Sequence, residues 1–214
     1  LKPSIRKNPN IIKELTVNIE KNDDIIKALA LDNLGNLYIT GRTETPDMES
    51  TLTRRNYDTS YDAFIGKISN DMELIWMTNL GGSDYDQGLG IEVDQDGFIY
   101  IAGVTFSEDF VVEDADSSIS GLIDGFVSKL NNDGKIVWSR YLGGKSWNEG
   151  ANDITLDNQG NVYICGWTQS RNFGDTGKSL NVYQGGFSDG FLAKLNGDGE
   201  IIWSSYIGGK KEEE

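Results

Sequence analysis

The sequence predicts an all-β protein built from three copies of one four-stranded antiparallel unit. A ten-residue motif occurs three times, at Asp32–Gly41, Asp94–Gly103 and Asp157–Gly166. The copies recur after 62 residues (Asp32 to Asp94) to 65 residues (Gly143 to Gly208). The chain holds 26 glycines and only 3 prolines among its 214 residues, and turn residues occur at regular intervals. A fixed period of this size is typical of stacked units that cannot bury a core alone.

The remainder of each unit repeats in a constant order. An Asp-x-Phe tripeptide, a tryptophan and a glycine pair follow each motif. They begin at Asp62, Trp76 and Gly81, at Asp124, Trp138 and Gly143, and at Asp189, Trp203 and Gly208.

Four strand-like runs can be recognised in the second copy, at Gly88–Val93, Phe98–Thr105, Gly125–Leu130 and Lys135–Leu142. Asp-Gly turns separate the first run from the second and the third from the fourth, and such turns favour tight hairpins. Four antiparallel strands per unit form the blade of a β-propeller. The predicted fold is therefore a set of three propeller blades, which stays an incomplete propeller unless it is extended or oligomeric.

Glycine recurs at two structural points in every copy. Gly41, Gly103 and Gly166 interrupt the second strands, which predicts a close backbone approach or a β-bulge at each. The glycine pairs follow the fourth strands, where we predict positive φ angles that let the chain cross to the next blade.

Tryptophan and lysine also recur. Trp76, Trp138 and Trp203 are predicted to supply a large part of the contact between blades. The third strands carry one repeated lysine each, at Lys67, Lys129 and Lys194. We predict an ion pair with the aspartate of Asp-x-Phe or of the Asp-x-x-Gly turn; the alternative is a ring of lysines lining an axial channel.

Charge and composition exclude several classes of function. The formal charge of −15 disfavours nucleic acid and anionic membranes as partners, because phosphate binding needs clustered basic residues. The absence of histidine removes the commonest general base and most zinc or copper sites. The sequence contains no apolar run of about 20 residues, the length that would predict a membrane-spanning helix. Cys165 occupies the strand position of Thr40 and Ala102, so we predict a small buried residue.

The ordered motifs resemble the SBBP type of β-propeller repeat over roughly Ile25 to Gly209. The resemblance implies a bladed propeller, usually in secreted or surface-attached bacterial and archaeal proteins. It implies neither a particular enzyme activity nor a fixed set of catalytic residues.

The predicted organisation is an N-terminal segment at 1–24, blades at 25–83, 84–145 and 146–210, and a charged tail at 211–214. In the N-terminal segment, Ile11–Ile19 reads as a degenerate fourth strand that lacks the tryptophan and the glycine pair. Three blades do not close a ring, for which about four to eight are typical. We therefore expect either a longer parent chain or self-assembly.

The predicted function is a non-catalytic structural or protein-interaction module, secreted or at the cell surface, that binds protein partners or self-associates through blade edges into an oligomer or filament. Residues present in all three copies are assigned to structure, and recognition to the loops that differ. The candidate interaction residues in or beside those loops are Tyr57, Tyr61, Trp147, Trp167, Tyr183 and Phe187.

Two alternatives remain open. The loop aromatics, with carboxylate pairs such as Asp84 with Asp86 or Glu149 with Asp153, suggest a glycan-binding or glycan-cleaving propeller. The Asp-rich turn at Asp94 suggests a calcium-stabilised surface scaffold, although hydrogen-bonded hairpin turns explain the same residues. No other cofactor is predicted.

Overall fold

The computed structural model describes residues 24–44, 61–110, 119, 121–144, 148–173 and 183–209. Within them, twelve strands form three four-stranded sheets. The first sheet contains β1 (Ile25–Leu31), β2 (Leu37–Thr43), β3 (Asp62–Ile68) and β4 (Leu74–Leu80). The second contains β5 (Asp86–Val93), β6 (Ile99–Thr105), β7 (Asp124–Leu130) and β8 (Ile136–Leu142). The third contains β9 (Glu149–Leu156), β10 (Val162–Thr168), β11 (Asp189–Leu195) and β12 (Ile201–Ile207).

Each sheet follows the order of the chain. Neighbouring strands are consecutive in sequence, and every pair is antiparallel. The predicted all-β fold of three four-stranded blades is therefore confirmed, and the strands of the second copy begin and end within two residues of their predicted bounds. Among the described residues, no helix is long and apolar enough to span a membrane.

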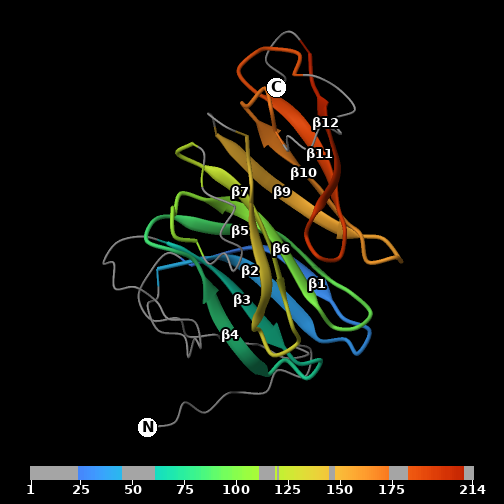
Figure 1. Ribbon diagram of the computed structural model, residues 1–214. Helices are drawn as coiled ribbons and strands as arrows, with labels where there is room; N and C mark the ends of the chain where they lie inside the picture. Colours follow the sequence, from blue (N-terminus) through green and yellow to red (C-terminus); the bar gives the residue numbers. More distant parts are fainter. Residues whose placement is uncertain are drawn as a thin grey trace, which may run out of the picture.

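The sheets stack face to face, and the first strand of each packs against the preceding sheet. β5 lies against β1, β2 and β3 of the first sheet, and β9 lies against β5, β6 and β7 of the second. In Figure 1 the sheets follow one another from the bottom of the molecule to the top. The described sheets do not close into a ring.

The core lies between the sheets, so the second sheet is buried on both faces. Ile99 and Ile101 of β6 belong to the apolar cluster shared with the first sheet. Tyr100 and Ala102 point the opposite way, into the cluster shared with the third sheet. Alternate residues of one strand thus fill two interfaces, as the two-residue period of a β-strand requires.

The strand glycines behave as predicted. A β-carbon at Gly103 would lie 2.0 Å from the carbonyl oxygen of Gln87 on the first strand of the sheet, and equivalent clashes arise at Gly41 and Gly166, at 1.8 and 1.9 Å. The pairing of the first two strands shifts register beside each of these glycines. The predicted close approach and bulge are both confirmed.

Glycine occupies the paired positions for a different physical reason from the predicted one. Neither Gly81-Gly82 nor Gly143-Gly144 has a positive φ, so that prediction was wrong. A β-carbon at Gly81 would instead lie 2.8 Å from carboxylate oxygens of both Asp62 and Asp86. Glycine is needed there because two acidic side chains pack against the backbone.

Candidate functional site

A repeated contact joins each sheet to the next. The indole Nε1 of Trp76 donates to the carbonyl oxygen of Asn132, which lies in the turn between β7 and β8, at 3.2 Å. Lys67 Nζ and Tyr38 OH both donate to the Asn132 side chain, the tyrosine at 3.1 Å. A β-carbon on Gly134 of the same turn would lie 3.0 Å from the Trp76 ring. The turn of one sheet thus caps the tryptophan of the sheet before it.

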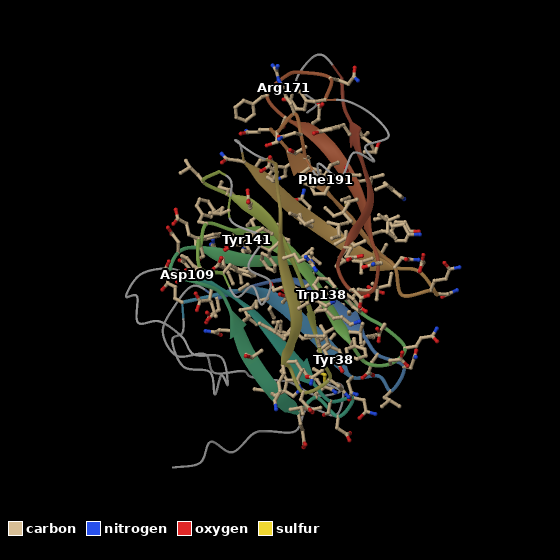
Figure 2. The ribbon with its side chains drawn as sticks, in the orientation of Figure 1. Tyr38, Asp109, Trp138, Tyr141, Arg171 and Phe191 are labelled. Carbon is tan, nitrogen blue, oxygen red and sulfur yellow. The ribbon has the colours of Figure 1, made fainter. Side chains whose placement is uncertain are left out.

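The second junction repeats this arrangement. Trp138, labelled in Figure 2, donates through Nε1 to the carbonyl oxygen of Gly197 at 3.1 Å. Lys129 Nζ donates to the same oxygen at 3.4 Å, and Arg140 donates to the next carbonyl of that turn. A β-carbon on Gly199 would lie 3.0 Å from the Trp138 ring. The predicted role of tryptophan in the contact between blades is therefore confirmed at both junctions.

The third sheet ends in the same constellation. In every sheet the tryptophan meets the edge of a tyrosine on the second strand, with ring centroids 6.4 Å apart and interplanar angles of 70°, 69° and 68°. The pairs are Tyr38 with Trp76, Tyr100 with Trp138, and Tyr163 with Trp203. The Trp203 ring therefore holds the orientation that the two capped rings adopt.

Apolar positions of the third sheet face outward where their counterparts are buried. Leu192 is 37% exposed, whereas Val127, at the equivalent position of the second sheet, is 0% exposed. Cys165 is exposed, whereas Ala102 is buried. The prediction of a buried Cys165 was wrong, because no described sheet covers that face of the third blade.

The repeated lysines form an ion pair only at this open end, among the described residues. Lys194 Nζ lies 3.6 Å from Asp157, the aspartate of the Asp-x-x-Gly turn, as predicted. In the first two sheets that prediction was wrong, because Lys67 and Lys129 donate to the turn of the following sheet. The axial-channel alternative also fails for Lys67 and Lys129, because both side chains are directed to the turn of the following sheet.

Buried carboxyl groups lie at the strand ends near the sheet junctions. Asp86 is fully buried and its carboxylate accepts hydrogen bonds from Gly82 N at 2.8 Å and Ser107 Oγ at 2.9 Å. Burial, with a smaller contribution from the charge of Asp62, raises the pKa of Asp86 to about 7. Asp86 is therefore poised to bind a proton near neutral pH.

The same pairing recurs at the next junction. Glu149 accepts from Thr168 Oγ1 at 2.9 Å and lies near the carboxyl group of Asp124, which belongs to the preceding sheet. Burial raises the pKa of Glu149. The sequence paired Glu149 with Asp153, and Asp86 with Asp84. The catalytic interpretation of those pairs stays a prediction, and the fold also brings an acid of the preceding sheet near each buried group, Asp62 near Asp86 and Asp124 near Glu149.

The Asp-rich turns are hydrogen-bonded hairpins. Asp94 Oδ1 accepts from the backbone amides of Asp96 and Phe98, each at 2.9 Å, and Oδ2 accepts from Tyr100 OH at 3.2 Å. In the equivalent turn, hydrogen bonds, above all that from the Asn161 side chain, lower the pKa of Asp157. Both oxygens of each carboxylate therefore already have partners, and the hairpin interpretation is confirmed.

An acidic groove of about 440 Å³ lies between two of these hairpins, with Glu92, Asp94 and Asp157 in its lining. Burial, with the charge of Asp153, raises the pKa of Glu92. Among the described residues, no group of three His, Cys, Asp or Glu side chains is arranged to hold a metal ion. Calcium binding stays a prediction.

The candidate aromatics separate into three sets. Tyr57 and Trp147 lie outside the described residues. Tyr61 packs at the first junction, with the Arg42 guanidinium 4.4 Å from its ring centroid. Trp167 lies within β10 and not in a loop as predicted, because the strand continues to Thr168.

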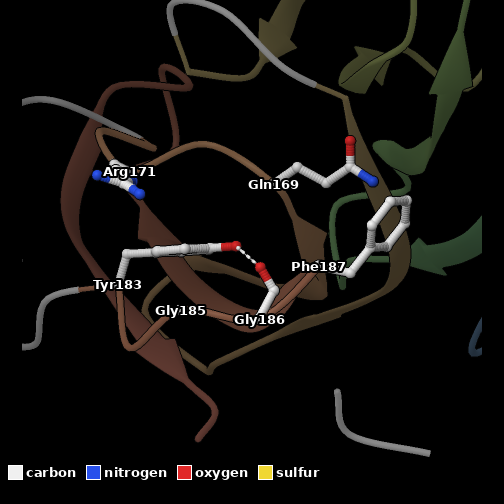
Figure 3. Close-up of a pocket in the computed structure, with 6 residues that line it drawn as sticks. All are labelled: Gln169, Arg171, Tyr183, Gly185, Gly186 and Phe187. Carbon is white, nitrogen blue, oxygen red and sulfur yellow. Dashed lines mark hydrogen bonds between the residues drawn. The ribbon is translucent and has the colours of Figure 1, made fainter. Parts of the chain in front are cut away.

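Tyr183 and Phe187 come together at a pocket of about 500 Å³ on the third sheet. Figure 3 shows Arg171 and Tyr183 on one side of this pocket, with Gln169 and Phe187 on the other. Tyr183 OH donates to the Gly186 carbonyl at 3.0 Å, and Phe187 is 67% exposed. The sequence indicated both aromatics but not Gln169 and Arg171, because these two lie more than ten positions earlier in the chain.

Comparison with known proteins supports the repeat assignment. Residues 75–110 and 137–174 match the family described as SBBP: Beta-propeller repeat. These matches confirm the resemblance inferred from the motifs. A crystal structure of a protein of unknown function from Bacteroides caccae is similar at 11% identity, covering 87% of this chain and 88% of that one, with a TM-score of 0.25. No curated protein matches the chain.

Proposed function

We propose that this chain is a non-catalytic structural or protein-interaction module, acting outside the cell or at its surface. It would bind protein partners, or further copies of itself, through the open face of the third sheet. The observation that carries this proposal is the exposure of Leu192 at a position where the second sheet buries Val127 completely. Only the SBBP-type repeats suggest that the protein acts outside the cell or at its surface.

The first sheet presents a second open face. Leu29 of β1 is 65% exposed, whereas its counterparts Ile91 and Ile154 are 4% exposed because they pack against the preceding sheet. Contiguous apolar surface on a soluble protein is typical of interaction sites. A propeller segment with two such faces is suited to assembly with other polypeptides.

Association of the purified chain tests this function. We expect light scattering to show association that strengthens with concentration and that Leu192→Lys weakens, since a charge at the centre of an apolar contact opposes binding. Alkylation of Cys165 should slow as association proceeds. Burial, with the charge of Asp153, raises the pKa of the Cys165 thiol, so the reaction should be run at about pH 8.5.

Matched controls accompany this test. Gln95→Lys adds the same charge at an exposed turn of the second sheet, whose two faces are already covered, and should leave association unchanged. A chain that stays monomeric at every concentration would contradict self-association. A Leu192→Lys variant that associates as strongly as the unaltered chain would contradict the assignment to this face.

A second candidate function is glycan binding at the pocket of Tyr183 and Phe187. Exposed aromatic rings stack on sugars, and Gln169 and Arg171 supply hydrogen-bond donors. None of the described residues that line this pocket is acidic, so the pocket supports binding rather than glycan cleavage. We expect Phe187→Ala to abolish any signal on a glycan array, and Tyr61→Phe to preserve it. No binding across a broad array would dismiss this candidate.

A further inference from the structure

We propose that the pocket lined by Gln169, Arg171, Tyr183 and Phe187 binds an acidic saccharide. The carboxylate of a hexuronic acid would pair with Arg171, and its sugar ring would stack on Phe187. This inference rests on the second candidate function, glycan binding at the same pocket, and specifies the chemical class of the glycan.

Arg171 reverses the charge that the second sheet carries at the equivalent position. Thr105 and Thr168 are equivalent, because each pairs with the aspartate that begins the third strand of its sheet. Three residues after that threonine, the second sheet has Glu108 and the third has Arg171. Because the second blade folds in the same way with an acid at this point, the fold does not need a positive charge there. The chain has 34 acidic and 19 basic residues, yet no described residue that lines the pocket is acidic.

The guanidinium group of Arg171 is available to a ligand. Arg171 is exposed and forms no ion pair with another described residue. Burial, with the charge of Asp189, raises the pKa of Tyr183, and the positive charge of Arg171 opposes that rise. The guanidinium group therefore lies close to the Tyr183 phenol, whereas Asp189 is buried and does not line the pocket. A planar guanidinium binds a carboxylate through two parallel hydrogen bonds.

The other lining residues fit a sugar ring. The exposed ring of Phe187 can stack on the apolar face of a pyranose. Gln169 stands where the second sheet has Phe106, which packs against another aromatic ring, and its amide can both donate to and accept from adjacent hydroxyl groups. Tyr183 OH donates to a backbone carbonyl, so its oxygen can accept a hydrogen bond from the sugar. The volume of about 500 Å³ is within the range of roughly 300–1,000 Å³ that small ligands occupy.

The experiment compares two ligands that differ in charge but share their rings and hydroxyl groups. Trigalacturonic acid and its trimethyl ester are each titrated against the full chain, with dissociation constants measured by ligand-observed NMR at neutral pH. Salt at about 150 mM limits repulsion by the net charge of −15, because the screening length is then about 8 Å. We expect the acid to bind about tenfold more tightly than the ester, since only the acid forms charge-assisted hydrogen bonds with Arg171.

Arg171→Gln should weaken binding of the acid about tenfold and leave binding of the ester unchanged. The matched control is Lys135→Gln, which removes a positive charge from the exposed turn between β7 and β8, at the opposite end of the strands from the pocket, and should change neither affinity.

Three outcomes would overturn the assignment to an acidic saccharide: equal affinities for the acid and the ester, a preference that survives Arg171→Gln, or a preference that Lys135→Gln also removes. If the ester still binds in those cases and Phe187→Ala abolishes that binding, the glycan-binding function stands without the preference for acid. If neither probe binds and a broad glycan array gives no signal, both the preference and the glycan-binding function fail.

Discussion

The outer face of the second sheet and the outer face of the third carry the same residue pattern in different surroundings. The second sheet buries Val127 and Ala102 beneath β9, and its Trp138 receives a turn. The third presents Leu192 and Cys165 to solvent. What differs is the neighbour rather than the motif. A residue repeated for structure in two blades therefore lies at an exposed surface in the blade that has no described neighbour.

A buried charge gives the largest expected contrast between the two faces. Val127→Asp should lower the free energy of unfolding by about 4 kcal/mol or more, because an unpaired carboxylate would lie in the closed core between sheets. Leu192→Asp should cost about 1 kcal/mol, because solvent reaches that position. Urea denaturation of both variants measures the difference. Equal losses would mean that Leu192 is covered in solution.

Tryptophan truncation should give the next contrast. We expect Trp138→Ala to cost about 3 kcal/mol, since it removes the contact with the Gly199 turn and the hydrogen bond to Gly197. Trp203→Ala should cost about 1 kcal/mol, since it loses chiefly its edge contact with Tyr163. Thermal and urea unfolding compare the two. A larger loss for Trp203 would contradict an open third face.

The filled junctions should also make stability depend on pH. The pKa of Asp86 is about 7 in the folded protein, raised from 3.8 mainly by burial, so the folded state holds this proton more tightly than the unfolded state. The resulting stabilisation is complete below about pH 4 and is lost as the pH rises through 7. We expect the free energy of unfolding to fall by about 4 kcal/mol between about pH 4 and pH 8.

Asp86→Asn isolates this effect because asparagine keeps an acceptor for Gly82 and Ser107 without ionising. The variant should be more stable than the unaltered chain at pH 8 and similar to it at pH 4. Urea denaturation at both values checks this. A difference that is the same at pH 4 and pH 8 would show that the pKa of Asp86 is the same in the folded and unfolded states.

Calcium should have the smallest effect. Both oxygens of Asp94 already accept hydrogen bonds from the chain, so a cation would have to compete with them. We expect melting temperatures in chelator and in millimolar calcium to agree within about 1 °C. A rise of several degrees in calcium would favour the calcium-stabilised scaffold instead.

Local periodicity allowed most of the fold to be predicted. Alternation and Asp-Gly turns depend on residues close in sequence, so the strands, the hairpins and the bulges at Gly41, Gly103 and Gly166 follow from them. The candidate site was predicted only in part. The sequence found Tyr183 and Phe187 but not Arg171 and Gln169 across the pocket, because these two precede the aromatics by more than ten positions and only the fold brings them together.

The repeat by itself determined that this protein consists of antiparallel four-stranded blades, since hydrophobic alternation and turn chemistry act within about ten residues. Only the tertiary structure decided how those blades use their shared residues. It brought Asp62 near Asp86 and Asp124 near Glu149, placed a glycine beneath Trp76 and Trp138, and left Trp203 without a described turn. The physical reason is that burial, pKa and hydrogen bonding depend on the neighbouring sheet, which comes from a separate repeat.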